Sequence, residues 1–210
     1  MSGYKTVLHE ASAEIIEKRS RFIGYCKNTA AEADAIDFIN TIRAKHRDAS
    51  HNVYAYCVRE NNMSRYSDDG EPQGTAGLPV LDVIRKENLT DICIVVTRYF
   101  GGVLLGTGGL VRAYSKSAKL GVDAAVRVEM TKRAIVTVRT DYRTHQKLEY
   151  ALRERGFDVR DTAFAESVVI TIAPREEELD ALCALVTDST QGSSRPEKIG
   201  EEFVPQRIES

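Results

Sequence analysis

Residues 92–110 read ICIVVTRYFGGVLLGTGGL. The run Ile92–Phe100 is rich in β-branched and aromatic residues and apolar enough to form a central strand of a sheet. The glycine cluster Gly101–Gly109 follows this run and leads directly into a helical segment, Leu110–Ala125. The stretch therefore predicts a buried strand, a glycine-rich turn and a helix, in that order.

The residues before this stretch predict a mixture of strands and helices. Apolar residues spaced by three or four indicate a helix, whereas β-branched and aromatic runs indicate a strand. On these criteria we expect two strands within residues 4–28, a helix at Ala30–His46 capped by Thr29, a strand at Asn52–Arg59, a polar loop at Glu60–Gln73 and a helix at Thr75–Lys86.

The residues after position 130 predict a second domain. We expect a strand at Ala134–Arg139, a helix at Arg143–Glu154, strands at Phe157–Ala163 and Ser167–Ala173, a helix at Glu176–Thr187 and a strand at Glu202–Arg207. This β-α-β-β-α-β order is the ferredoxin-like pattern. The sequence therefore predicts an α+β protein with two domains, residues 1–130 and 131–210.

The composition is that of an ordinary soluble protein, with 42% hydrophobic and 29% charged residues. The longest apolar runs, such as Ile92–Val96, are far shorter than the roughly 20 residues that a membrane-spanning helix needs. Residues 1–10 lack the charged and apolar regions of a secretory signal. We therefore expect a cytoplasmic protein without a membrane partner.

Cysteine and histidine residues give no sign of a metal site. The four cysteines, Cys26, Cys57, Cys93 and Cys183, are widely spaced and form no C-x-x-C pair. We expect reduced, buried thiols that pack as small hydrophobic groups. The isolated residues His9, His46 and His145 are expected to face solvent. The sequence predicts neither a metal nor any other cofactor.

The charge is evenly distributed along the chain. The net charge is −2. Residues 1–50 contain 8 basic (Lys, Arg) and 7 acidic (Asp, Glu) residues, residues 51–130 contain 9 of each, and residues 131–210 contain 12 basic and 15 acidic residues. No segment carries the basic excess that dominates sequence-independent nucleic-acid binding. Any contact with RNA must therefore come from a local cluster of cations.

The glycine-rich turn is the first candidate site. Glycine permits a positive φ and a close approach of a ligand, and the first turn of a helix offers unpaired N–H groups to an anion. Two arginines flank the turn, so a phosphate or carboxylate could lie between them. The candidate residues are Arg98, Tyr99, Gly101, Gly102, Gly106, Gly108, Gly109 and Arg112. Alternatively, the glycines serve packing alone.

The turn matches neither of the common nucleotide-binding motifs. No Gly-Lys-Ser/Thr follows it, as a P-loop requires, and Val111 stands where a dinucleotide fingerprint has its third glycine. We therefore expect no nucleotide cofactor.

The second candidate site is the loop that contains Asp68, Asp69 and Glu71, together with His51 and Tyr54. Carboxylates with a histidine could hold a divalent cation or transfer protons. The string DDGEP at 68–72 is also good turn chemistry, and we favour this interpretation because nothing else completes an acid–base pair. G-x-S-x-G and H-E-x-x-H motifs are absent, so no catalytic residue is assigned and enzymatic activity stays open.

Three stretches resemble the IMPACT/YigZ family. They are HNVYAY at 51–56, DDGEPQGTAG at 68–77, and RYFGG at 98–102 continued by LGTGGLVRAY at 105–114. The resemblance covers roughly residues 15–125, and the remaining segment is similar to the C-terminal domain of the bacterial members.

The resemblance implies a fold for each domain. The N-terminal domain should resemble the second domain of ribosomal protein S five, with helices on one face of a four-stranded sheet, a fold shared with domain IV of elongation factor G. The C-terminal domain should resemble domain V of that factor. This pairing suggests contact with RNA or the ribosome by analogy of fold.

Three functions follow as hypotheses. The first is a non-enzymatic, translation-associated regulator that binds RNA or the ribosome through the glycine-rich turn, with Tyr54, Tyr56, Tyr99 and Phe100 available for stacking if their faces are exposed. The second is a protein–protein interaction module, because eukaryotic relatives bind a protein partner in the translational stress response. The third is a hydrolase or transferase that uses His51, Asp68, Asp69 or Glu71. The oligomeric state is not predicted.

Overall fold

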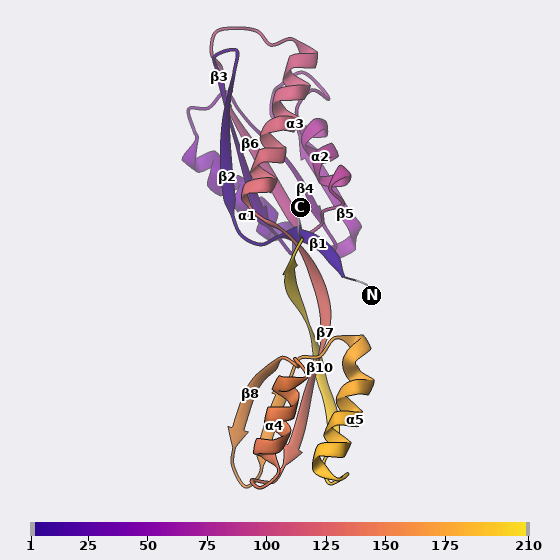
Figure 1. The fold of residues 1–210 in the computed structure, drawn as a ribbon. Coiled ribbons are helices and arrows are strands. Elements are labelled where there is room, and N and C mark those ends of the chain that lie inside the picture. Colours follow the sequence, from indigo (N-terminus) through magenta and orange to yellow (C-terminus); the bar gives the residue numbers. More distant parts are fainter. Residues whose placement is uncertain (1–2, 209–210) are drawn as a thin grey trace. The chain divides into compact units, whose positions relative to one another are not determined.

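A computed structural model of the protein describes residues 3–208. The chain folds into two compact units (Figure 1). Of the described residues, the N-terminal unit contains Tyr4–Glu129 and residues 205–208, and the C-terminal unit contains Met130–Val204 with Gly3. The outermost residues of the two predicted domains, 1–2 and 209–210, lie outside the described residues.

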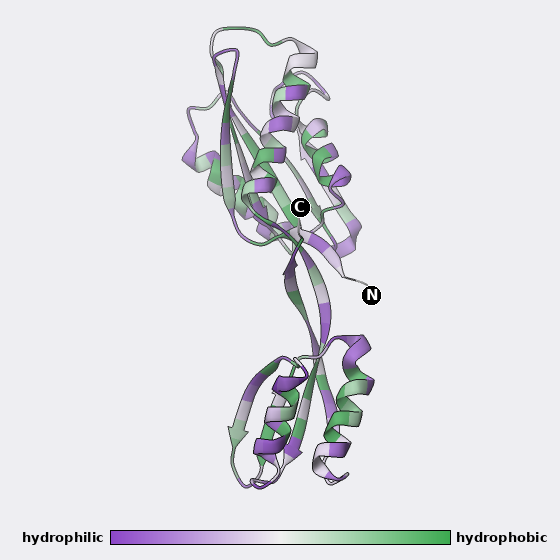
Figure 2. Cartoon of the chain, in the orientation of Figure 1, coloured by the Kyte–Doolittle hydropathy of each residue, from purple (hydrophilic) through white to green (hydrophobic). Residues whose placement is uncertain are grey.

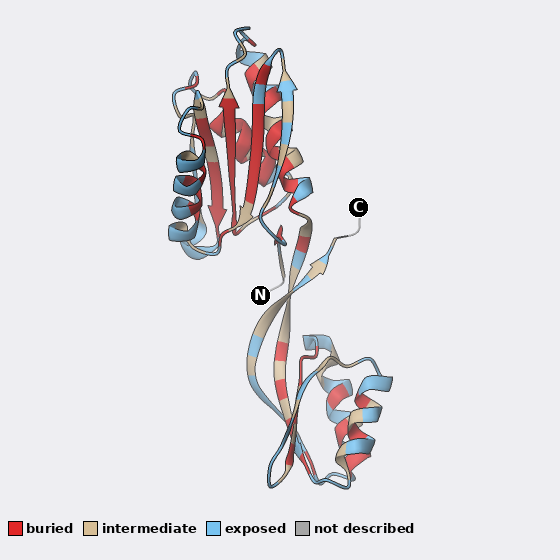
Figure 3. Cartoon of the chain, turned by 90° about the vertical axis from the view of Figure 1, so that its left-hand side faces the viewer, coloured by how far each residue is buried: buried red, intermediate tan, exposed pale blue. Residues whose placement is uncertain are grey.

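The N-terminal unit is built on a five-stranded antiparallel sheet. Its order is β2 (Ala11–Glu17), β3 (Ser20–Asn28), β6 (Ile92–Tyr99), β4 (His51–Val58) and β5 (Met63–Ser67). The strand predicted from the apolar run at 92–100 is confirmed as the central one. Figure 3 shows the inner strands of this sheet almost wholly buried.

Helices cover both faces of this sheet. Helices α2 (Gly77–Lys86) and α3 (Thr107–Ala124) pack on the face that carries Phe22 and Val96, whereas α1 (Glu32–Lys45) packs on the face that carries Val95. The α+β class is confirmed, but the expectation of helices on one face holds only for α2 and α3. The reason is that every residue from Ile92 to Val96 is apolar and buried, so β6 needs cover on both sides.

Several local predictions differ from the structure. Residues 4–28 form three strands instead of the two predicted, because the chain starts with a short additional strand at Tyr4–Val7. The predicted polar loop at 60–73 contains a 3-10 turn, Glu60–Asn62, and the edge strand β5. Helix α3 begins at Thr107, three residues before the predicted start. The N-cap of α1 is Ala31 instead of Thr29, and its N–H group donates to the Asp34 carboxylate at 3.1 Å.

Helix α3 lies unusually close to strand β3. A Cβ atom placed on Gly24 would stand 2.2 Å from the carbonyl oxygen of Ser117, and one on Gly121 would stand 2.8 Å from the carbonyl oxygen of Gly24. These distances are shorter than any van der Waals contact, so only glycine allows this approach. The two glycines thus set the position of α3 and of its N-terminal end.

The C-terminal unit has the expected β-α-β-β-α-β order. Its elements are β7 (Arg127–Thr140), α4 (His145–Glu154), β8 (Val159–Phe164), β9 (Val168–Ile172), a 3-10 turn (Glu176–Glu178), α5 (Leu179–Thr190) and β10 (Pro196–Arg207). Strand β7 pairs with β9 and β10, and also with the short strand β1 (Tyr4–Val7), while β9 pairs with β8. Leu148 of α4 and Leu182 of α5 share one core with the sheet. This arrangement fits the ferredoxin-like prediction.

The helices are amphipathic in both units, as the mixture of hydrophobic and hydrophilic residues along each of them shows (Figure 2). Within residues 3–208, none of the helices is long and apolar enough to cross a membrane.

Candidate functional site

A pocket lies where β6 ends and α3 begins. Its volume is about 420 Å³. Three ionisable residues line it, His51, Glu71 and Arg98. The rest of the wall is mainly apolar and consists of Pro72, Phe100, Leu104, Leu105, Gly106, Thr107 and Leu110. We call it the β6–α3 pocket. It brings together members of both candidate sites predicted from the sequence.

Arg98 and Glu71 form a buried ion pair at this pocket. The Arg98 Nη1 donates to Glu71 Oε1 at 2.5 Å, and only 6% and 4% of the two side chains are exposed. The Tyr114 hydroxyl donates to the same carboxylate oxygen at 2.7 Å. Burial, and next the charge of Glu71, raise the pKa of Tyr114 far above its ordinary value. The hydroxyl therefore stays protonated and remains a donor.

This ion pair corrects the hypothesis that Arg98 and Arg112 hold one anion. Residues two apart in a strand share a face, so Arg98 lies on the same side as Ile94 and Val96, under α2 and α3. Its guanidinium is engaged by Glu71 and, at 3.4 Å, by the Ser20 hydroxyl. Arg98 is thus a component of the protein interior.

His51 lies beside this ion pair, and one of its hydrogen bonds defines the tautomer of its neutral ring. Its Nδ1 lies 2.8 Å from the backbone carbonyl oxygen of Asp69. A carbonyl oxygen can only accept, so Nδ1 carries the hydrogen and the neutral ring has its lone pair on Nε2. The Nε2 atom lies 3.8 Å from Glu71 Oε1. Of the carboxylates in the loop, the structure therefore brings only Glu71 next to the imidazole of His51.

Asp68 and Asp69 organise the loop. Asp68 accepts hydrogen bonds from the N–H groups of Gly74, Ala76 and Gly77 at 2.8–3.1 Å. Asp69 accepts from the N–H group of Asn52 and from the Arg43 guanidinium. These contacts agree with the turn interpretation of the DDGEP string and leave neither carboxylate directed at the pocket.

The tyrosines proposed for stacking lie on the opposite face of the sheet. Tyr54 packs against the core beneath α1 and stacks on Tyr56, with ring planes 11° apart. The Tyr99 hydroxyl is engaged by His46 and Asp48. These three rings therefore lie on the other face of the sheet from the β6–α3 pocket. Phe100, which is 49% exposed, is the aromatic residue that lines the pocket.

Different structural requirements explain the glycines of the turn. A Cβ atom on Gly101 would lie 2.1 Å from the backbone of Arg19, so this position serves packing. Gly102 and Gly106 have φ values of 79° and 74°, which favour glycine. A Cβ atom on Gly109 would lie 3.0 Å from Leu105, whereas one on Gly108 would meet only the Arg112 guanidinium at 3.5 Å. Packing therefore does not explain Gly108.

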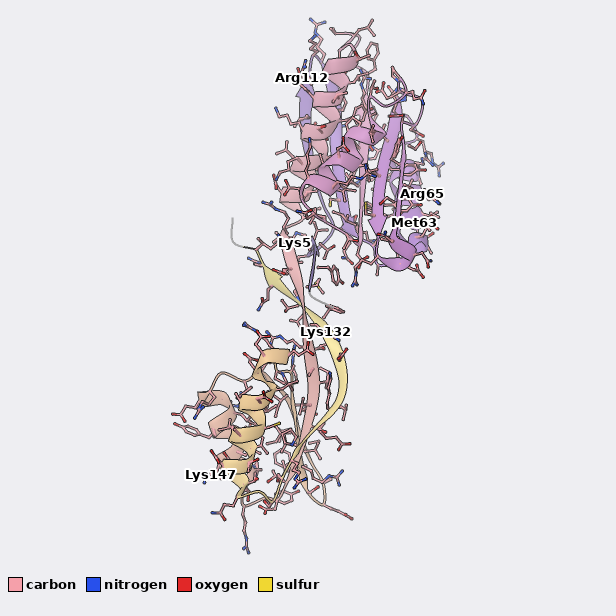
Figure 4. The ribbon with its side chains drawn as sticks, turned by 90° about the vertical axis from the view of Figure 1, so that its right-hand side faces the viewer. Lys5, Met63, Arg65, Arg112, Lys132 and Lys147 are labelled. Carbon is pink, nitrogen blue, oxygen red and sulfur yellow. The ribbon has the colours of Figure 1, made fainter. Side chains whose placement is uncertain are left out.

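The start of α3 is open and has cations beside it. The N–H groups of Thr107, Gly108 and Gly109 have no hydrogen-bond acceptor among the described residues. Arg112 lies near this end of the helix (Figure 4). It lines a second hollow of about 250 Å³, which we call the basic pocket, together with Glu17, Lys18, Leu105, Gly109, Ala113 and Lys116.

Lys18 and Lys116 were not predicted as site residues. Lys116 follows Arg112 by four positions, so helical spacing alone places the two side chains on one face. Lys18 comes from the turn between β2 and β3, and only the folded chain brings it to α3. No group of three or more His, Cys, Asp or Glu side chains in residues 3–208 is arranged to hold a metal ion.

Two family models match the chain. Residues 18–122 match the Impact N-terminal domain, and residues 138–193 match a domain of unknown function, DUF1949. The first model covers half of the chain, including every residue that lines the β6–α3 pocket and all those that line the basic pocket except Glu17.

Relatives of known sequence and structure cover most of the chain. The IMPACT family member YvyE of Bacillus subtilis is 40% identical over 195 residues, which are 92% of this chain and 90% of that protein. YigZ of Escherichia coli is 33% identical over 84% of this chain and 88% of its own length. A solved structure described as "Crystal structure of an hypothetical protein" has a TM-score of 0.60 at 28% identity and covers 95% of this chain and 98% of its own. The chain therefore belongs to the IMPACT family, in the two-domain form that it shares with YvyE and YigZ.

Proposed function

We propose that this protein is a translation-associated factor that binds RNA, alone or within the ribosome, at the basic pocket and the adjoining start of α3. The observation that carries the proposal is the open helix start beside Lys18, Arg112 and Lys116. All three side chains are exposed, and none forms an ion pair within the described residues.

Phosphate is the group that this surface fits. Free N–H groups and the positive end of the helix dipole favour an anion, and three cations on one side can neutralise successive backbone phosphates. Glu17 is the one acidic residue at the basic pocket. The local excess of positive charge supports RNA binding although the chain as a whole carries a net charge of −2.

The test is the salt dependence of binding. Purified ribosomes and an isolated hairpin RNA are titrated with wild-type protein and with Lys18→Ala/Arg112→Ala/Lys116→Ala. We expect the variant to bind at least tenfold more weakly at low salt, with a slope of log K against log salt that is smaller by roughly 2 to 3, because each phosphate contact contributes about 0.7–0.9.

The matched control removes the same charge from the C-terminal unit. Lys147 is an exposed residue of α4 (Figure 4). The variant Arg143→Ala/Lys147→Ala/Arg155→Ala should bind as the wild type does. Equal slopes for the wild type and the basic-pocket variant would contradict the proposal.

One observation favours a protein partner as the second candidate. Next to the pocket the loop exposes apolar side chains, with Leu104 81% exposed beside Val103 and Phe100. A partner held by these side chains would stay bound at high salt and after nuclease treatment, whereas phosphate-driven binding weakens.

A further inference from the structure

The β6–α3 pocket differs in character from the basic pocket beside it. Leu105 lines both hollows and forms the wall between them. On the β6–α3 side the charges of Arg98 and Glu71 neutralise each other, and the walls are formed largely by Phe100, Leu104 and Leu110. An uncharged group fits such walls, whereas an anion fits the basic pocket.

The polar groups of the β6–α3 pocket include two acceptor residues, His51 and Glu71, beside the guanidinium of Arg98, which donates to Glu71. Because Nδ1 donates to the Asp69 carbonyl, the neutral form of the His51 ring carries its lone pair on Nε2. The Oε1 atom of Glu71 accepts both hydrogen bonds, from Arg98 and Tyr114, and Oε2 accepts none from the described residues. Two neighbouring acceptors match a ligand edge that carries neighbouring N–H donors.

We propose that the β6–α3 pocket binds one unstacked guanine base of the RNA whose backbone occupies the basic pocket. The inference rests on the proposed function and adds the base to it. Guanine presents N1–H and the N2 amino group side by side, which suits the acceptors of His51 and Glu71. Phe100 offers a ring face for stacking.

The position of the start of α3 supports this assignment. Gly106 and Thr107 line the β6–α3 pocket, while Gly109 and Arg112, one turn further on, line the basic pocket. A nucleotide can therefore place its phosphate at the free N–H groups and its base in the apolar pocket. The volume of about 420 Å³ lies in the range of small-ligand sites, which is about 300–1,000 Å³.

The experiment compares single-stranded uridine heptamers that differ only at the central position. The centre is guanine, inosine, uracil or an abasic site, and affinity is measured by fluorescence anisotropy. Inosine lacks only the N2 amino group of guanine. We expect the guanine oligomer to bind about tenfold more tightly than the other three, which is the effect of losing one good pair of base contacts.

Two variants connect this preference to the pocket. Phe100→Ala and His51→Ala should bind all four oligomers alike while they keep the salt slope of the wild type. Phe164→Ala, which removes an exposed phenylalanine from the C-terminal unit, is the matched control and should keep the guanine preference.

The outcomes separate this inference from the proposed function. Equal, salt-dependent affinity for the four oligomers overturns the guanine site and leaves phosphate binding intact. Loss of salt-dependent binding overturns the proposed function, and free guanosine then tests the pocket alone. Guanosine that shifts the His51 imidazole NMR signals where inosine does not supports the base site, and no shift at millimolar guanosine overturns it.

Discussion

The guanidinium of Arg98 and the carboxylate of Glu71 lie 2.5 Å apart beneath the β6–α3 pocket, with Tyr114 as a further donor to the same oxygen. Removal of one partner leaves the other charge buried without compensation, which costs about 3–5 kcal/mol. We expect Glu71→Ala to lower the free energy of unfolding of the N-terminal unit by about this amount, and Tyr114→Phe by about 1 kcal/mol.

Urea denaturation followed by tyrosine fluorescence measures both effects. The chain has no tryptophan and nine tyrosines, seven of which lie before residue 130. An unchanged urea midpoint for Glu71→Ala would show that the ion pair does not stabilise the folded chain.

The contact between Gly24 and Ser117 predicts a steric effect of a single methyl group. In Gly24→Ala the new Cβ atom meets the Ser117 carbonyl oxygen at 2.2 Å, so α3 must move away from β3. We expect a loss of about 1–3 kcal/mol or more in the free energy of unfolding, as is typical of overpacking. Gly108→Ala is the control, because its Cβ atom meets only Arg112 at 3.5 Å. Similar thermal midpoints for the two variants would contradict the predicted clash.

His46 predicts a loss of stability in acid. The sequence suggested a solvent-facing ring, but only 8% of the residue is exposed. The Tyr99 hydroxyl donates to Asp48, so His46 Nδ1 donates to Tyr99 and Nε2 accepts from the Tyr25 hydroxyl at 2.6 Å. Burial, and next the charges of Lys45 and Arg21, lower the pKa of His46, while Asp48 opposes them. The folded chain therefore holds the ring neutral.

The sign of the pH effect follows from this lowered pKa. Between the folded pKa and the ordinary value near 6.5, the unfolded chain binds more protons than the folded chain. The stabilisation is complete above about pH 6.5 and is lost as the pH falls toward the folded pKa. Thermal midpoints at about pH 7.5 and about pH 5.5 should differ less in His46→Gln than in the wild type. His9→Gln, at an exposed position, should retain the full difference.

The cysteines predict one reactive thiol in the native protein. Cys26, Cys57 and Cys93 are buried, so a reagent in solution does not reach them in the native chain. Burial also raises the pKa of Cys26 and Cys93, so these two thiols stay protonated. Cys183 is exposed, which corrects the expectation of four buried thiols. A chromogenic disulfide reagent should titrate one thiol in the native chain and four after denaturation. Cys183→Ser should abolish the native reaction, and a persisting native thiol would contradict this assignment.

The sequence was most informative where the local pattern and the fold agree. The run from Ile92 is apolar at every position, so its central place in the sheet follows from burial on both faces. Strand β5 could not be found in the same way, because MSRYS at 63–67 is short and largely exposed and is held by pairing with β4. The start of helix α3 was predicted three residues too late because Gly108 and Gly109 occupy its first turn, and glycine is a poor helix former.

The sequence identified most residues of the candidate site but not what each of them contacts in the folded chain. The turn, His51 and Glu71 were identified, yet Arg98 was expected at the surface. The alternation along β6 already indicated its burial, since Arg98 shares a face with Ile94 and Val96. Lys18 reaches the start of α3 only because the turn between β2 and β3 lies there in the folded chain, and the local sequence gives no sign of this position.

The central place of β6 has a consequence for synthesis of the chain. Strands β2 and β3 form one hairpin and β4 and β5 another, and β6 alone joins them, although it is the last strand of this sheet in chain order. Until residue 99 has emerged, the nascent chain holds two hairpins whose inner edges lack a neighbour, and such edges invite pairing with other chains. We therefore expect the N-terminal sheet to close late and in a single step. Fragments that stop before Ile92 should aggregate, whereas those that extend through α3 should fold.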